Sequence, residues 1–380
     1  MWLNSANTPK KPLTINQQVD TIIYTMEETK RKLASIQTIK SLTPIEGADR
    51  IEVAEVLGWH VVVKKGEFKV GDLVVYCEVD SLLPIRTEYA FLQSGGVKKM
   101  LHEGKEVEGY RLKTVRLKGQ ISQGICFPLS ILPEHSTIPV EDVARVEGAD
   151  VTDLLGIIKY ERPVPESMAG KMRGNFPGFI PKTDETRLQT VPKILEKYRD
   201  VSFYVTEKLD GSSVTFFIKD DEFHVCSRNT DLLETPDNLI WKVAREMDIE
   251  GTLRDMGGKY ALQGEIVGGK VQGNKLKLSQ PTIYFFSVFD MERSEYVDFE
   301  EVMHMIGRYK LQFVPVVEHF FTLKQTVDEM VQFATRTSEL NPEVWVEGLV
   351  FRPRKEMRDE DLGRLSFKVI NPEFLLKNDE

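Results

Sequence analysis

The segment EKLDGSS, Glu207 to Ser213, carries the residue types and spacing that most suggest chemistry. Lys208 and Asp210 leave the same face of a predicted strand that ends at Gly211. Neutralising a lysine at pH 7, from an ordinary pKa of about 10.4, costs roughly 4–5 kcal/mol, and a nearby aspartate adds to that cost. A divalent cation shared with Asp210 would reverse this effect and favour the neutral amine. The alternative is an ordinary strand-end lysine paired with an aspartate across a turn.

Two further acidic residues lie inside apolar strands. Glu265 follows a glycine in YALQGEIVG, and Glu347 precedes one in WVEGLVF. Because buried carboxylates are costly unless they are paired or bound to metal, these two indicate a shared cation site or contacts to a ribose. Either alone is otherwise an edge-strand carboxylate that faces water. Lys368 in LSFKVINP, with Arg364 before it, needs an anion among its apolar neighbours, and a phosphate would serve.

The distribution of residue types along the chain predicts the strands and helices that must position these residues. From Leu33, short runs rich in β-branched residues, such as RIEVAEVLG and DLVVYCEV, alternate with Gly and Asp turns. This pattern is typical of a small antiparallel barrel of the OB type. Residues 151–182 are rich in Pro and Gly and indicate a linker between domains. Strands and amphipathic helices follow; one helix, TPDNLIWKVAREM, is predicted with Thr235 as N-cap and Pro236 at its first position.

We therefore predict an α+β protein with an N-terminal extension (1–32), an OB-like β-barrel (33–165) and a catalytic domain of antiparallel sheets with flanking helices (166–380). Among the 380 residues there is no apolar run long enough for a transmembrane helix, and the N-terminus lacks the apolar core of a secretory signal. Three scattered cysteines predict neither a disulfide framework nor a zinc site. The net charge of −9 argues against a protein that simply coats nucleic acid.

At this point a family resemblance becomes clear. KLDG, CSRN, QGEI, FFSVFD, EGLVF and SFKV resemble, in order, motifs I, Ia, III, IIIa, IV and V of the covalent nucleotidyltransferase superfamily. That superfamily contains DNA ligases, RNA ligases and mRNA-capping enzymes, and the resemblance covers residues 183–370. It implies that the catalytic domain is a nucleotidyltransferase (ATP-grasp-like ligase) domain.

Two features of the domain order resemble the fifth type of ATP-dependent RNA ligase in particular. The OB-like barrel precedes the catalytic domain, and the chain ends twelve residues after Lys368, where DNA ligases and capping enzymes carry a further OB domain. TDETRLQ and GKVQGNKLKL also look like RNA-ligase segments. The alternatives are a DNA ligase, a GTP-dependent guanylyltransferase, or a nucleic-acid-binding homologue that has lost activity.

The resemblance implies a role for each catalytic residue. Lys208 would attack the α-phosphorus of ATP, expel pyrophosphate and hold AMP through a phosphoramide bond. Asp210 and Glu347 would hold a hydrated Mg²⁺ or Mn²⁺, and Glu265 would contact the ribose or help the metal. Lys368 would touch the α-phosphate and stabilise its developing charge.

The resemblance also implies contacts for the nucleotide and for the RNA. The nucleotide pocket would include Glu207, with Arg228 at the ribose or phosphates. Phe289, rather than Phe286, would stack on adenine. Motif V of the family carries a lysine where this chain has Ser366, a role that Arg364 would take over.

Arg187 would bind a phosphate of the substrate. A basic strip within YRLKTVRLKGQ would either grip the RNA backbone or form the wet face of a strand: Arg111, Lys113, Arg116 and Lys118. The expected partner is RNA or an RNA-containing duplex. We expect a monomer in the cytoplasm, with no membrane association.

Overall fold

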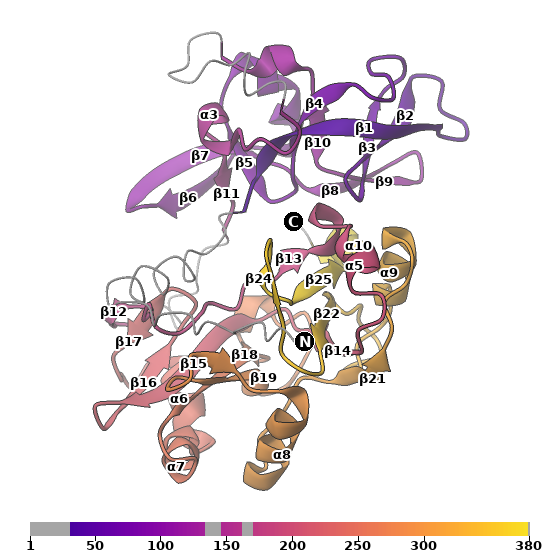
Figure 1. The fold of residues 1–380 in the computed structure, drawn as a ribbon. Coiled ribbons are helices and arrows are strands. Elements are labelled where there is room, and N and C mark those ends of the chain that lie inside the picture. The colour runs from indigo at the N-terminus through magenta and orange to yellow at the C-terminus, as the bar shows by residue number, and fades with distance from the viewer. Residues whose placement is uncertain (1–30, 134–145, 162–169, 379–380) are drawn as a thin grey trace, which may run out of the picture.

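The structure, a computed structural model, describes residues 31–133, 146–161 and 170–378. These residues form an N-terminal domain (31–161) and a C-terminal domain (170–378), which face each other across a cavity (Figure 1). Most of the predicted N-terminal extension, and the predicted boundary at residues 165 and 166, lie outside the described residues.

The N-terminal domain is built from antiparallel strands around two buried cores. Its main sheets have the orders β10-β4-β1-β2-β3 and β11-β5-β7-β6, and β8 and β9 form a separate hairpin. A bulge between Ile39 and Ser41 lets β1 pair first with β4 and then with β2. The strands are β1 (Ala34–Pro44), β2 (Ile51–Val56), β3 (Trp59–Lys64), β4 (Leu73–Cys77), β5 (Ser81–Pro84), β6 (Lys98–His102), β7 (Lys105–Arg111), β8 (Thr114–Leu117), β9 (Gln120–Gln123), β10 (Ile125–Phe127) and β11 (Ile158–Lys159).

The C-terminal domain contains a seven-stranded sheet, β12-β17-β16-β15-β18-β19-β20, and a five-stranded sheet, β13-β25-β22-β14-β21. A small ribbon, β23 and β24, lies beside them. The strands are β12 (Met172–Asn175), β13 (Thr186–Arg187), β14 (Phe203–Lys208), β15 (Ser212–Lys219), β16 (Glu222–Cys226), β17 (Thr230–Leu232), β18 (Tyr260–Val267), β19 (Thr282–Asp290), β20 (Glu295–Tyr296), β21 (Val316–Phe321), β22 (Gly348–Pro353), β23 (Arg358–Asp359), β24 (Gly363–Arg364) and β25 (Phe367–Ile370).

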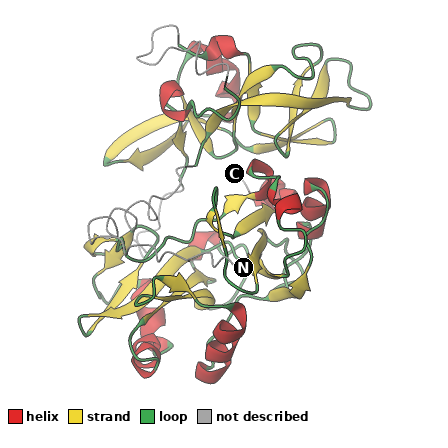
Figure 2. Cartoon of the chain, in the orientation of Figure 1, coloured by secondary structure: helices red, strands yellow, loops and turns green. Residues whose placement is uncertain are grey.

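Helices flank both domains, as predicted for an α+β protein (Figure 2). The predicted helix after Thr235 exists, but it begins later: Asn238, not Thr235, is its N-cap, and the Asn238 side chain accepts a hydrogen bond from the Trp241 N–H at 3.1 Å. The α-helices are α3 (Thr152–Leu155), α5 (Ile194–Lys197), α6 (Leu239–Glu246), α7 (Ile249–Asp255), α8 (Phe299–Tyr309), α9 (Val327–Ala334) and α10 (Pro372–Asn378); 3-10 turns are η1 (Thr87–Gly95), η2 (Leu129–Ile131), η3 (Leu188–Thr190) and η4 (Val271–Gly273).

The register of the five-stranded sheet arranges several basic residues on one face. Lys208 lies opposite Gly348, and Lys368 lies opposite Val350. The short β13 runs parallel to β25 and sets Arg187 beside Lys368, a parallel pair at the edge of a domain predicted to have antiparallel sheets. Lys208, Gly348 and Ile370 share one row of the sheet. Since alternate residues of a strand share a face and lie about 7 Å apart, Lys368 is on the same face, two strands away from Lys208 and one such step along, and Arg187 is one strand further.

Within the described part of the chain, no helix combines the length and the apolar character that crossing a membrane requires. The three cysteines are buried with free thiols: Cys77, Cys126 and Cys226.

Candidate active site

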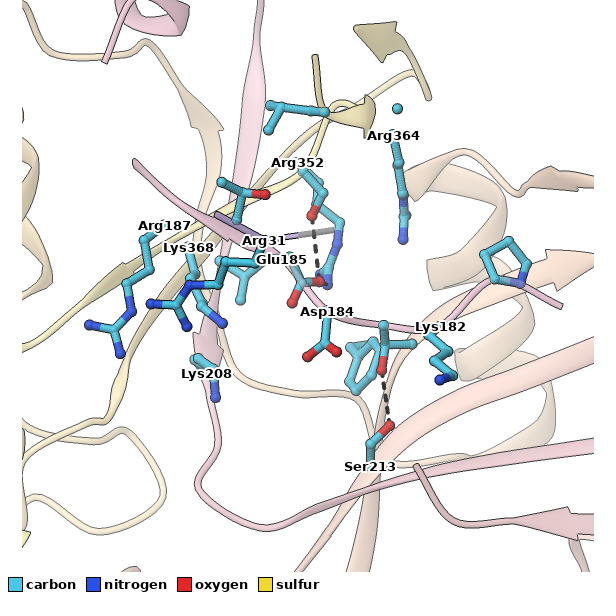
Figure 3. Close-up of a pocket in the computed structure, with 18 of the residues that line it drawn as sticks. Arg31, Lys182, Asp184, Glu185, Arg187, Lys208, Ser213, Arg352, Arg364 and Lys368 are labelled. Carbon is cyan, nitrogen blue, oxygen red and sulfur yellow. Dashed lines mark hydrogen bonds and ion pairs between the residues drawn. The ribbon is translucent and has the colours of Figure 1, made fainter. Parts of the chain in front are cut away.

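The two domains enclose a cavity of about 2670 Å³, part of which is shown in Figure 3. Its walls come from the catalytic strands β14, β18, β22 and β25, from β13, and from the N-terminal domain between β4 and β5. The volume exceeds that of a typical small-molecule pocket, about 300–1,000 Å³. The structure brings most of the predicted residues together at this cavity: Arg111, Arg187, Glu207, Lys208, Asp210, Arg228, Glu265, Phe286, Phe289, Glu347, Arg364 and Lys368.

Lys208 and Glu347 form the central ion pair of the cavity. The Lys208 Nζ lies 2.7 Å from both carboxylate oxygens of Glu347, which follows from the pairing of β14 with β22. Burial would lower the pKa of Lys208, but the carboxylates of Glu347 and Glu265 outweigh burial and raise that pKa above its ordinary value. The amine is therefore protonated at rest, and a nucleophilic role requires a change in the charge around it.

Asp210 lies two residues after Lys208 and pairs with a lysine from another segment. The Lys275 Nζ is 2.8 Å from the Asp210 Oδ2, and both side chains are less than one-fifth exposed. The turn that carries Asp210 packs tightly, because a Cβ on Gly211 would lie 2.2 Å from the Ile266 carbonyl oxygen. A Cβ on Gly348 would likewise meet backbone, so glycine is required beside both Asp210 and Glu347.

Glu265 completes the acidic side of the cavity from the middle of β18. Burial raises the pKa of Glu265 to about 8, and the negative charges of Glu347 and Asp210 add to that rise, while Lys208 opposes it. Two lysines, Lys208 and Lys275, thus balance Glu347 and Asp210, and Glu265 holds a proton at neutral pH.

Replacing Glu265 by glutamine is expected to flatten the pH dependence of stability in the metal-free protein. The folded state keeps the Glu265 proton up to about pH 8, whereas the unfolded chain releases it near the ordinary pKa of 4.5. The unfolding free energy of the wild type therefore falls as pH rises between these values. Going from pH 5 to pH 8 should lower the Tm of the wild type by several degrees more than that of Glu265→Gln.

Thermal unfolding in EDTA at both pH values measures this difference. Glu318→Gln on the exposed part of β21 is the matched control, and it should follow the wild type. Equal pH dependence in the wild type and Glu265→Gln would show that Glu265 is ionised in the folded protein.

Lys368 faces the cavity from β25 with its side chain among other cations. Burial, together with the neighbouring charges of Lys208 and Arg187, lowers the pKa of Lys368 to about 7. Figure 3 shows Lys368 close to Arg187 and Arg31, above Lys208. This concentration of positive charge in a buried wall fits a phosphate group, which would hold Lys368 in its charged form.

The carboxylates fit a hydrated divalent cation rather than a direct protein cage. Among the described residues, no three His, Cys, Asp or Glu side chains converge as a ready set of metal ligands. Asp210 and Glu347 instead each hold an ammonium group at 2.7–2.8 Å inside the cavity. Mg²⁺ commonly keeps several waters and is held through one or two carboxylates, and Asp210 and Glu347 suit that arrangement.

The two candidate aromatic residues of β19 differ in exposure. Phe289 is 2% exposed and packs in a core with Phe217 and Ala261. Phe286 is half-buried, lines the cavity and lies with its ring centroid 5.5 Å from the Arg352 guanidinium. The ladder between β18 and β19 slips at this point and skips Phe286, which turns its ring toward the cavity. The geometry favours Phe286, contrary to the prediction.

Three predicted nucleotide-binding residues are already engaged by protein groups. The Glu207 carboxylate accepts hydrogen bonds from the Ser338 hydroxyl, at 2.8 Å, and from the Glu339 N–H. Arg228 pairs with Asp184 at 2.7 Å. Arg364 pairs with Glu356, donates to the Ser287 hydroxyl at 3.1 Å and stacks on the Tyr296 ring. Arg364 and Ser366 both line the cavity, and contacts with Ser287 of β19 and Tyr296 of β20 hold the Arg364 side chain in place.

The predicted basic strip does not form one exposed surface. Arg111 is buried in the interdomain cavity, where it pairs with Asp80 and lies over Tyr160. Arg116 pairs with Glu373 of α10 in the C-terminal domain. Arg111 therefore does not share one exposed face with Arg116, because β7 ends at the cavity. Contact of Arg111, Lys113, Arg116 and Lys118 with RNA stays a prediction.

Sequence reasoning missed several charged residues that line the cavity. They come from loops, from β22 and from the facing domain: Arg31, Glu78, Asp80, Lys159, Asp184, Glu185 and Arg352. Lys275, the partner of Asp210, was missed as well. Lys275 was within reach of the sequence, since it lies in GKVQGNKLKL, the segment after Glu265 that resembles RNA ligases.

Comparisons with known proteins agree with this architecture. An OB-fold domain model matches residues 33–129, and an RNA ligase model matches residues 201–370. A search of curated protein sequences found no match. A variant of the Naegleria gruberi RNA ligase with AMP and Mn is 37% identical, with a TM-score of 0.82, and the match covers 92% of this chain and 99% of that one.

Two further structures of the same enzyme match equally well. The Naegleria gruberi RNA ligase with PPi is 38% identical with a TM-score of 0.81, and covers 92% of this chain and 99% of its own. A variant with ATP and Mn is 37% identical with a TM-score of 0.81, at the same coverage. Identity at this level over nearly the whole length, together with the lysine-centred cavity, shows that the chain belongs to the RNA ligase family.

Proposed function

We propose that this RNA ligase uses ATP and a divalent cation to place AMP on Lys208, and then joins a 5′-phosphate end to a 3′-hydroxyl RNA end. The observation that carries the proposal is the buried Lys208–Glu347 pair, set in a cavity with Asp210 on one side and Lys368 on the other. The Naegleria gruberi structures with AMP, ATP and Mn support the same cofactors here.

The chemistry follows from the groups around Lys208. Its amine loses a proton and its nitrogen attacks the α-phosphorus of ATP, so that an N–P bond forms and the bond to the pyrophosphate oxygen breaks. Lys368 and Arg187 line the same cavity as Lys208 and can neutralise charge on the phosphates there. AMP then passes to the oxygen of a 5′-phosphate, and a 3′-hydroxyl displaces it to form the phosphodiester.

Asp210 and Glu347 are the residues that would hold the cation. When bound, a divalent ion would favour the neutral amine of Lys208 and offset negative charge at the α-phosphate. A cation would take the place of ammonium groups, because the two carboxylates line the cavity and are paired there with Lys208 and Lys275.

The aromatic platform for adenine is assigned to Phe286. Phe286→Ala should raise the KM for ATP by about tenfold, since stacking of a base on an aromatic ring contributes about 1–3 kcal/mol. Phe289→Ala should instead lower the unfolding free energy by about 3–5 kcal/mol, with the KM of the folded enzyme nearly unchanged. Steady-state adenylation and denaturant unfolding of both variants check this; a large KM effect confined to Phe289→Ala would restore Phe289 as the stacking residue.

The proposed substrate is a nick in a duplex whose 3′-hydroxyl belongs to RNA. Sealing of matched nicks with RNA or DNA on the 3′-hydroxyl side, and of single strands, tests this preference directly. Faster sealing of the RNA nick is the expected result. Equal sealing of an all-DNA nick would favour a DNA ligase, and label transfer from GTP would favour a guanylyltransferase. The absence of any reaction would leave an inactive nucleic-acid-binding homologue.

The proposal includes a monomer in the cytoplasm. Three buried cysteines with free thiols are compatible with that reducing compartment.

A further inference from the structure

The N-terminal domain reaches into the active site through one carboxylate. Asp80, between β4 and β5, accepts a hydrogen bond from the Arg187 Nη2 of the C-terminal domain at 2.6 Å. Its other oxygen accepts from the Arg111 Nη2 at 3.0 Å. Burial would raise the pKa of Asp80, but Arg187, Arg31 and Arg111 together lower it to about 2. Asp80 is therefore an ionised bridge between an arginine of each domain.

The backbone of Asp80 is held in an uncommon conformation. Its φ is 68°, in the left-handed region that side-chain-bearing residues seldom adopt. Two backbone hydrogen bonds hold it there: the Asp80 N–H donates to the Leu112 carbonyl at 3.0 Å, and the Tyr160 N–H donates to the Asp80 carbonyl at 2.7 Å. The fold thus fixes the direction of the carboxylate, and such strain is typical of functional positions.

The Arg187 guanidinium has hydrogen-bond donors that the Asp80 carboxylate does not use. The residue is 7% exposed and lies with its guanidinium 5.7 Å from the centre of the Trp59 ring. Asp80 takes only the Nη2 group, while Nε and Nη1 have no hydrogen-bond partner among the described residues. An arginine this buried with two unpaired donors calls for an anion. Its strand neighbour Lys368 has the same requirement.

We propose that Asp80 is a positioning residue: with Arg111 it holds Arg187 so that the remaining donors meet a phosphate in the cavity. This inference rests on the proposed function and deepens it, because nucleotidyl transfer to Lys208 then depends on the docked N-terminal domain. Asp80 leaves donors for the phosphate, since among the described residues it accepts from Nη2 and not from Nε or Nη1.

A second pair of carboxylate contacts supports docking as a defined state. Glu78, two residues before Asp80, accepts from the Arg31 Nε at 2.7 Å and from the Thr190 hydroxyl of the C-terminal domain at 2.9 Å. The Gly58 N–H donates to the Gln189 carbonyl at 2.9 Å, and a Cβ on Gly58 would lie 3.0 Å from Gln189. The segment that follows Arg187 is thus clamped by the N-terminal domain at several points.

The test is a double-mutant cycle with a docking control. Asp80→Ala should slow single-turnover label transfer from ATP by about tenfold or more, and Asp80→Asn should lie between it and the wild type. Glu373→Ala, which breaks the interdomain pair with Arg116 away from the cavity, should stay close to wild type. In the Arg187→Ala background, Asp80→Ala should cause no further loss, since it acts through Arg187.

Equilibrium binding of inorganic pyrophosphate to the same proteins gives a readout that does not depend on the reaction. Asp80→Ala and Arg187→Ala should weaken binding to the same extent, and the double variant no further. Additive losses, or tighter binding and faster labelling in Asp80→Ala, would overturn the inference. Absence of labelling in the wild type with a non-additive binding cycle would instead reject the proposed function and keep the inference.

Discussion

Lys208→Ala is expected to abolish covalent labelling of the protein by α-labelled ATP, whereas sealing of pre-adenylated RNA should continue. The amine of Lys208 is the nucleophile of the proposed first step. Lys275 is engaged by Asp210 at 2.8 Å, and Lys368 is assigned to phosphate binding. Pre-adenylated RNA already carries the activated phosphate, so its sealing needs the phosphate-binding residues and not the nucleophile.

The experiment compares label retained on the protein after denaturing electrophoresis with sealing of pre-adenylated RNA. Lys242→Ala, on the exposed side of α6, is the matched lysine control and should label like the wild type. Retention of label in Lys208→Ala would move the nucleophile elsewhere. Loss of both activities would indicate that Lys208 also positions the RNA phosphate, or that the unpaired Glu347 disturbs the site.

Local sequence was enough to place the groups on strands that share one site. The chain marks Lys208 and Glu347 by their apolar strands and by the glycine beside each motif, and the structure pairs these strands, β14 with β22. At Gly211 and Gly348 another backbone segment approaches so closely that a side chain would not fit. The sequence shows the two glycines but not the segments that approach them. The OB-like domain followed from turn spacing, and the structure confirms it.

Residues brought by long-range docking could not be predicted in the same way. Asp80 lies 107 residues before Arg187, and only the packing of the two domains makes them partners. The same packing removes Arg111 from the surface, although its alternation with apolar residues is typical of an exposed strand. A charge pattern reports what a strand could present to solvent, not what another domain covers.

Small local irregularities explain the other differences. The slip between β18 and β19 shifts the alternation by one residue. Phe286 and Phe289 therefore both line the cavity, but Phe289 is buried in a core and Phe286 is the more exposed ring. At α6, Thr235 and Asn238 are both good N-cap residues. Asn238 prevails, and its buried side chain caps the first turn of the helix. Competing local signals of similar strength are decided by packing.

Glu347→Ala is expected to reduce adenylation of Lys208 by roughly a thousandfold, a loss of the size seen when a group that stabilises developing charge is removed. Glu347 has two separable relationships in the structure. It pairs with the resting ammonium of Lys208 at 2.7 Å, and it faces the cavity as one of the two carboxylates suited to a hydrated cation. Glu343→Ala, an exposed glutamate on the loop before β22, is the control and should remain active.

The two relationships predict opposite pH behaviour, which makes the variant decisive. If Glu347 only held the ammonium, its removal would lower the pKa of Lys208, because the carboxylates raise it. Adenylation at neutral pH would then rise above that of the wild type rather than fall, and it would increase further with pH. If Glu347 holds the cation, a higher pH will not restore the rate, but higher concentrations of Mn²⁺ will restore part of it. Rates of Glu347→Ala and Glu347→Gln across pH and Mn²⁺ concentration separate the cases, and we expect rescue by metal and not by pH.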